Sequence, residues 1–213
     1  MTEIINSIMR SGLTGIAIAA VGFIAALIIA ERWRFFSQSI GKSFKFFRII
    51  SEHISRGDIG AAISACDSNP TLPSSVVTKE ILMRADRDDA SMEAGLEIGL
   101  SKLEPMINKR VDFIATLANI STLLGLLGTI IGLIITFSSF SNGDAEGGKA
   151  ALTAGISLAM STTALGLVVA IPITFLGSMI EGKRDRSVSL YKEKLEVILD
   201  QLKNRHLKQK IAN

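Results

Sequence analysis

Three long stretches of this sequence contain no Asp, Glu, Lys or Arg, and they restrict the possible folds more than any other feature. One covers residues 11–30, with 20 residues, and the others cover residues 113–143 and 150–180, with 31 residues each. A helix in water needs a polar face, whereas a helix that crosses a bilayer needs about 20 apolar residues. The sequence therefore predicts an all-α integral membrane protein with three transmembrane helices, at 11–30, 113–140 and 150–180.

The two longer stretches would each extend about 46 Å as straight helices, but the hydrocarbon core of a bilayer is about 30 Å thick. We therefore predict that two of the three helices are long and extend beyond the membrane into the cytoplasm. A cleaved signal peptide fits the first stretch less well than a membrane span. Residues 1–10 carry one Glu and one Arg, and the apolar run is longer than a typical signal core.

The distribution of basic residues indicates which segments face the cytoplasm. Residues 31–112 contain 12 Lys and Arg and residues 181–213 contain nine, whereas Arg10 and Lys149 are the only ones elsewhere. Lys and Arg close to spans mark the cytoplasmic side, so this pattern, and not nucleic-acid binding, accounts for the net charge of +3. We predict a periplasmic N-terminus (1–10), a cytoplasmic helical domain (31–112), a periplasmic loop (141–149) and a cytoplasmic C-terminal helix (181–213).

Hydrophobic spacing predicts helices in the cytoplasmic parts, and no segment shows the alternation of a strand. The predicted helices are Gly57–Cys66, Val76–Met83, Met92–Leu103 and an amphipathic helix at Val188–Leu207. Asp58 is the expected N-cap of the first. Pro105 is expected to bend the chain as it enters the second span.

Small residues recur at three- and four-residue steps in all three spans, which favours close packing of helix backbones in lipid. The predicted packing residues of the second and third spans are Gly125, Gly128, Gly132, Gly166 and Pro172. Hydroxyl groups lie in the same stripes, because Thr122, Thr129 and Thr136 are seven residues apart and Thr162 and Thr163 occur in the third span. These five threonines either line a polar pathway or belong only to packing seams.

No span contains a carboxylate, His, Lys or Arg, although ion pathways in membranes normally carry such groups. If the protein conducts protons, a partner must supply the carrier; otherwise it is a scaffold or a passive pore. His53 and His206 are expected at the surface and lack metal-ligand spacing, and Cys66 is expected to be buried. Without a phosphate loop or a catalytic set, the sequence predicts neither an enzyme nor a bound cofactor or metal.

Two motifs resemble the signatures of one family. Residues 123–132, LLGLLGTIIG, resemble the LLGLLGTVxG motif of the MotA/TolQ/ExbB proton channel family, and residues 162–172, TTALGLVVAIP, resemble its TTAxGLxVAIP motif. Three spans, with a cytoplasmic domain after the first, are similar to the TolQ/ExbB branch, since MotA has four spans.

The resemblance implies a subunit of the bacterial inner membrane that couples ion-motive force to mechanical work in TonB-type transport, Tol-type envelope maintenance or surface motility. It implies a homopentamer, contact with phospholipids, and a dimer of a single-span partner of the ExbD, TolR or MotB type that carries a membrane Asp. Thr129 and Thr163 match the family's pore threonines. Leu158 stands where ExbB and TolQ usually have Glu, and Thr122 stands where they usually have Pro, which leaves the ion, H⁺ or Na⁺, open.

Overall fold

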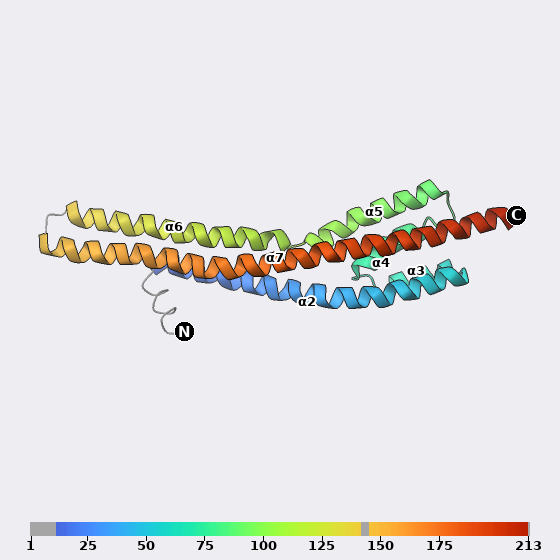
Figure 1. Ribbon diagram of the computed structural model, residues 1–213, viewed down its shortest axis with the longest axis horizontal. Helices are drawn as coiled ribbons and strands as arrows, with labels where there is room; N and C mark the ends of the chain where they lie inside the picture. Colours follow the sequence, from blue (N-terminus) through green and yellow to red (C-terminus); the bar gives the residue numbers. More distant parts are fainter. Residues whose placement is uncertain (1–11, 142–144, 213) are drawn as a thin grey trace. The chain divides into compact units, whose positions relative to one another are not determined.

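The protein is an assembly of α-helices, as predicted (Figure 1). A computed structural model describes residues 12–141 and 145–212, and every regular element in these ranges is helical. The helices are α2 (Gly12–Arg56), α3 (Ile59–Asp67), α4 (Pro73–Leu82), α5 (Asp89–Asn108), α6 (Val111–Ser141) and α7 (Ala145–Ala212). The predicted periplasmic N-terminus, 1–10, lies outside the described residues. Of the predicted loop, 141–149, only residues 142–144 separate α6 from α7.

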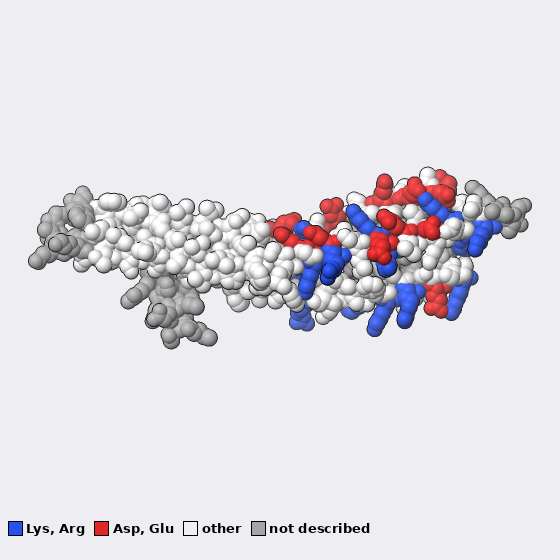
Figure 2. Space-filling model, in the orientation of Figure 1, with Lys and Arg blue, Asp and Glu red and all other residues white. Residues whose placement is uncertain are grey.

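The chain forms two compact units, and the long helices α2 and α7 contribute to both. Of the described residues, the first unit comprises 12–32, 110–141 and 145–180, and the second comprises 33–109 and 181–212. On the face shown in Figure 2, charged side chains cover the second unit and leave most of the first unit uncharged. This separation of charge follows directly from the three charge-free stretches of the sequence.

Three helical stretches are long and apolar enough to cross a membrane. They lie within Gly12–Arg56, Asp89–Ser138 and Leu152–Lys208, and only 22%, 28% and 33% of the residues in their most apolar windows are buried. Most apolar side chains of the first unit therefore face outward, which suits contact with lipid or with other membrane helices.

The helix of the first span continues without a break to Arg56, although we predicted the span only to residue 30. The continuation buries one face, with Phe36, Phe47 and Ile54 inside the second unit, and it contains no proline. It ends where Gly57 adopts a φ of 80°. The amide of Gly57 donates to the carbonyl of Ile54 and that of Asp58 to the carbonyl of His53, which is the hydrogen-bond pattern of a Schellman C-cap.

The short helices after α2 form where local sequence signals predicted them. The side chain of Asp58 accepts a hydrogen bond of 2.8 Å from the amide of Ala61, and it is the N-cap of α3. α5 packs closely on α4 through two glycines. A Cβ at Gly95 would lie 2.8 Å from the carbonyl oxygen of Glu80, and one at Gly99 would lie 2.9 Å from the Cα of Val77.

Pro105, where we expected a bend, does not interrupt the helix before the second span. α5 continues past this proline to Asn108, and α6 begins at Val111. The helix is broken instead at Arg110, which has a φ of 63°, a left-handed conformation that cannot continue a right-handed helix. The proline is therefore accommodated in the last turns of α5.

The C-terminal part of α7 is amphipathic, as predicted. Its buried face carries Tyr191, Leu195, Ile198 and Leu202, and the Tyr191 hydroxyl accepts a hydrogen bond of 3.3 Å from Ser43 of α2. This face of α7 therefore packs on neighbouring helices of the second unit.

Candidate functional site: the α6–α7 seam

α6 and α7 run antiparallel in the first unit and approach each other through glycines on both helices (Figure 1). A Cβ at Gly132 would lie 2.8 Å from the carbonyl oxygen of Gly155, and one at Gly166 would lie 2.9 Å from that of Ser121. At Gly125 the nearest atom to an added Cβ would be the Thr162 carbonyl oxygen, at 3.2 Å. We call this contact the seam. Only residues without side chains allow backbones to come so close.

Thr136 and Thr162 lie inside the seam rather than along an open pathway. Their relative exposures are 1% and 0%, and Thr162 contacts the position where a Cβ of Gly128 would be. The Thr136 hydroxyl donates to the carbonyl of Gly132 at 2.9 Å, and that of Thr162 donates to the carbonyl of Ala159 at 2.9 Å. Both hydroxyls are satisfied by their own helix, which is the ordinary arrangement of a buried threonine in a span.

The three α6 threonines of the predicted line therefore lie progressively closer to the seam from Thr122 to Thr136. Thr122 is exposed, Thr129 is half-buried and Thr136 is buried. Residues seven apart on a straight α-helix drift by about 20° per heptad. Over two heptads the line moves about 40° around the helix, which is enough to carry its last member beneath α7.

Thr122, Thr129 and Thr163 lie at the edge of the seam, and each donates its hydroxyl hydrogen to a backbone carbonyl. Thr122 donates to Ala118 at 3.2 Å, and Thr129 donates to Leu126 at 2.6 Å. Thr163 donates across the seam to the carbonyl of Gly125 at 3.4 Å. A hydroxyl oxygen has two lone pairs. With its hydrogen engaged, each of these oxygens is an acceptor toward any group that approaches the edge.

The edge that carries Thr163 faces away from α2. α2 contacts α7 at Gly22, where an added Cβ would lie 2.8 Å from Val169. Thr163 precedes Val169 by six residues, so it lies about 120° around α7 from this contact. Thr163 donates to the carbonyl of Gly125, and Thr129 follows Gly125 by about one turn of α6. Thr163 and Thr129 therefore lie along the same edge of the seam. Within the described residues, α2 therefore leaves that edge open.

Two seam residues escaped the sequence prediction. Ser121 is fully buried, and its hydroxyl donates to the carbonyl of Gly166 at 3.2 Å. Gly155 meets Gly132 across the seam. Both could have been recognised from small-residue spacing. Ser121 precedes Gly125 by four residues, and Gly155, Ala159, Thr162 and Gly166 follow one another at steps of four, three and four. Pro172 lies on an exposed part of α7.

Charged groups appear where the first unit ends. Arg110 Nη1 lies 2.5 Å from Glu31 Oε2, and Arg32 Nη2 lies 3.1 Å from Glu31 Oε1. Glu31 thereby joins the end of the first span to the start of α6. The ion pair with Glu31 holds the side chain of Arg110, whose backbone is left-handed. These charged residues lie outside the charge-free stretch that carries the threonines.

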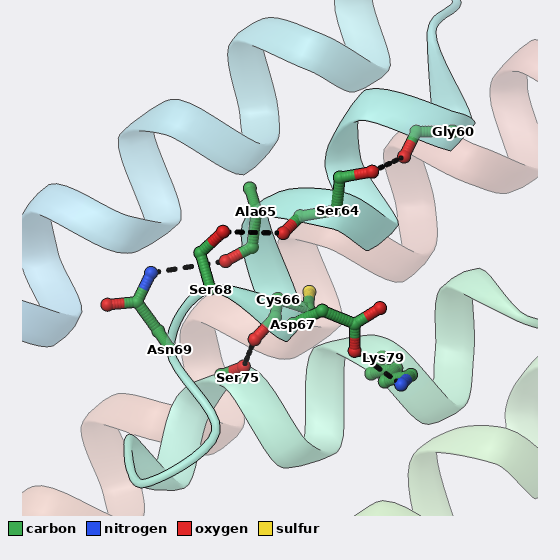
Figure 3. A network of polar contacts seen from close by, with 9 residues as sticks. All are labelled: Gly60, Ser64, Ala65, Cys66, Asp67, Ser68, Asn69, Ser75 and Lys79. Atoms are coloured by element: carbon green, nitrogen blue, oxygen red, sulfur yellow. Dashed lines mark hydrogen bonds and ion pairs between the residues drawn. The ribbon is translucent and has the colours of Figure 1, made fainter.

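The second unit contains no comparable candidate for chemistry within the described residues. Figure 3 shows Cys66 at the end of α3, where Ser75 donates to its backbone carbonyl at 2.7 Å. Cys66 is 1% exposed, as predicted, and burial raises the pKa of its thiol to about 12. His53 and His206 are half-buried, and among the residues that the structure describes no three His, Cys, Asp or Glu side chains gather as a metal site.

The chain is similar to proteins of one family. The model of the MotA/TolQ/ExbB proton channel family matches residues 70–193, more than half of the chain. A putative biopolymer transport protein, ExbB-like 3, of Synechocystis sp. is 29% identical over 87% of this chain and 88% of its own length. The biopolymer transport protein ExbB of Aquifex aeolicus is 39% identical over 39% of this chain and 55% of its own length.

A further relative is the Tol-Pal system protein TolQ of Haemophilus influenzae, which is 32% identical over 36% of this chain and 33% of its own length. The matched family region contains α6, the seam and its edge threonines. Together with the three membrane-length helices, these matches assign the chain to a family: it belongs to the MotA/TolQ/ExbB proton channel family.

Proposed function

We propose that this protein is the channel subunit of an ExbB/TolQ-type motor of the bacterial inner membrane, which couples ion flow to mechanical work at the cell envelope. Its family membership and its ExbB- and TolQ-named relatives support an ion-channel role. The process served is TonB-type transport, Tol-type envelope maintenance or surface motility. One ion that crosses 100 mV releases about 2.3 kcal/mol for such work.

The observation that carries this proposal is the edge of acceptor oxygens at Thr122, Thr129 and Thr163. Their hydroxyl hydrogens are engaged by backbone carbonyls, so they can accept a hydrogen bond from a protonated carboxylic acid, or bind a cation, but they cannot carry a proton by themselves. The charge-free spans offer no carboxylate. The carrier is therefore the membrane Asp of a partner.

The proposed assembly follows from this division of roles. Copies of this chain form a homo-oligomer, a pentamer by family resemblance, in which the edges of α6 and α7 line a central pore. A dimer of an ExbD-, TolR- or MotB-like single-span partner occupies the pore, and phospholipids surround the outward apolar side chains. The N-terminus is periplasmic and the C-terminus cytoplasmic, in agreement with the 21 of 23 basic residues in 31–112 and 181–213.

The test is a threonine-to-valine series, which removes the hydroxyl and keeps the shape of the side chain. Thr129→Val and Thr163→Val should each lower ion flux in proteoliposomes that contain the partner by roughly tenfold or more, the effect of one lost hydrogen bond to a charged or reacting group. Thr116→Val is the matched control. Thr116 is exposed on α6 and donates to its own helix at 3.2 Å, but lies about 140° around α6 from Thr129.

Native mass spectrometry of each variant must show unchanged assembly for this comparison to hold. Flux measured with H⁺ or Na⁺ as the only permeant cation identifies the ion, which matters because Leu158 replaces the usual Glu. Normal flux in both edge variants would overturn the proposal. The scaffold or passive-pore alternative predicts that result, together with loss of assembly in Gly125→Leu.

A further inference from the structure

The second unit has two surfaces of opposite charge, and each belongs to a different helix. The part of α2 in this unit carries five basic residues and one acidic residue, whereas α5 carries four acidic residues and one basic residue. On the face shown in Figure 2, red side chains gather over α5 and blue side chains over α2. Two such surfaces on one chain can bind each other between copies.

The basic surface is a groove between α2 and α7, which we call the basic groove. Its lining residues combine aromatic or aliphatic side chains with three cationic ones, and they are Phe44, Lys45, Phe47, Arg48, Ser51, Lys194, Val197 and Ile198. Phe44 and Val197 are each 49% exposed at its rim. Within the described residues, Lys45 and Arg48 form no ion pair. Lys194 pairs with Glu193 at 2.9 Å. The groove thus offers apolar contact area and two cations, Lys45 and Arg48, that the described residues leave without an ion pair.

The acidic surface is a line on α5 that we call the acidic stripe. Glu93, Glu97 and Glu104 are exposed and spaced by four and seven residues, so they share one side of the helix. Ile98 beside them is 42% exposed. Glu93 bonds to Lys203 of its own chain, and Glu104 lines a pocket with Arg184 and Lys192. Glu97 forms no ion pair in the part of the chain that the structure describes, so it is the residue of the stripe that is left for a neighbouring copy.

The acidic stripe and the basic groove lie at the same level of the second unit. α5 runs beside α7, since Glu93 pairs with Lys203 and Glu104 lines a pocket with Arg184 and Lys192. Glu97 lies between these two contacts, and therefore at the level of Lys194 and Val197 of α7. Copies in one membrane share one orientation and are related by rotation about its normal, so surfaces at one level can meet.

We propose that the acidic stripe of one copy docks into the basic groove of the next copy, with Glu97 facing Arg48 and Ile98 against Phe44. This inference rests on the proposed homo-oligomer and names its cytoplasmic interface. The contact joins different surfaces, so it is head-to-tail and continues from copy to copy until a ring closes. It depends on exposed charges, so salt weakens it, because the screening length falls from about 10 Å at 0.1 M to about 3 Å at 1 M.

Charge exchange in the full-length protein tests this interface. Glu97→Lys and Arg48→Glu should each weaken self-association by roughly tenfold at low salt, since each turns attraction into repulsion, and the double variant should restore it. Glu196→Lys is the matched control, because Glu196 is an exposed residue of α7 that lies about 160° around the helix from the groove residue Ile198. Native mass spectrometry at two salt concentrations measures the assembly.

Cysteine cross-linking gives an independent measurement. In a Cys66→Ala background, Glu97→Cys with Arg48→Cys should give disulfide-linked species larger than a dimer in native membranes, and each single variant should give none. Oligomers that conduct ions but never form these cross-links would overturn the interface and leave the proposed function standing. Cross-links that stop at a dimer, or a failure of the double charge exchange to restore assembly, would also overturn it. Cross-linked rings with normal flux in both threonine variants would refute the proposed function alone.

Discussion

A methyl group added at Gly166 would force α6 and α7 apart. The new Cβ would lie 2.9 Å from the carbonyl oxygen of Ser121 and 3.0 Å from the Cα of Gly125. Both are backbone atoms, so neither can turn aside. Overpacking of this kind costs about 1–3 kcal/mol. Separation of the helices would also lose the Ser121 hydrogen bond to Gly166, which contributes about 1 kcal/mol.

Gly182→Ala provides the matched control, because it makes the same chemical change in the same helix. A Cβ at Gly182 would have no neighbouring atom within 4 Å, so the variant should gain about 1 kcal/mol from the higher helix propensity of Ala. Gly166→Ala has the same gain, which reduces its net cost to about 1–3 kcal/mol. The two variants should therefore differ by about 2–4 kcal/mol in free energy of unfolding.

Unfolding by increasing amounts of a denaturing detergent in mixed micelles, followed by circular dichroism, measures this difference. The expected order of stability is Gly182→Ala, then wild type, then Gly166→Ala. Equal stability of the two variants, or a larger loss for Gly182→Ala, would show that the seam tolerates a side chain. The description of α6 and α7 as backbones in direct contact would then be refuted.

Three further outcomes follow from the second unit. Burial raises the pKa of the Cys66 thiol to about 12, so this thiol should resist maleimide at pH 8 in the folded protein and react after unfolding. Mass spectrometry measures the labelling, and rapid labelling of the folded chain would contradict the burial of Cys66. Hydrogen bonds from Lys102 and Arg84 lower the pKa of Glu80 below its ordinary value of 4.5. This pair of bonds should stabilise the protein above about pH 4.5 by up to about 1 kcal/mol and lose that effect as the pH falls through the lowered pKa; a Glu80→Gln variant that keeps the same acid-side loss in melting temperature would refute the assignment. Asp58→Ala should cost about 1 kcal/mol in thermal stability through loss of the α3 N-cap, whereas Asp58→Asn should keep most of it; equal losses would argue against capping.

The two oppositely charged surfaces of the second unit bear on how a channel subunit assembles. Apolar side chains of the spans pack without strong preference for a partner in lipid, because lipid tails are equally apolar. Charged contacts outside the membrane give orientation and partner choice instead. A head-to-tail contact of α5 with α2 and α7 would fix the relative orientation of neighbouring copies around the pore that the edge threonines are proposed to line.

Much of the fold could be predicted from local signals. The absence of charge over 20 or more residues is enough to indicate a span, because the cost of a charge in hydrocarbon does not depend on which helix lies beside it. The α3 N-cap at Asp58 was predictable for a similar reason, since its hydrogen bond reaches only to Ala61. By contrast, the break at Arg110 carries no local signal, because the left-handed conformation occurs at an arginine that pairs with the distant Glu31.

For the candidate site, the amino-acid sequence is enough to identify the small and hydroxyl-bearing residues, the lack of a proton carrier in the spans, and the family motifs. The packing of α6 on α7 is needed to see that Thr136 and Thr162 are buried in the seam while Thr129 and Thr163 lie at its edge. The reason is geometric. Helix periodicity gives only the relative angles of residues around an axis, and whether a given angle faces protein or open space depends on where the neighbouring helix lies.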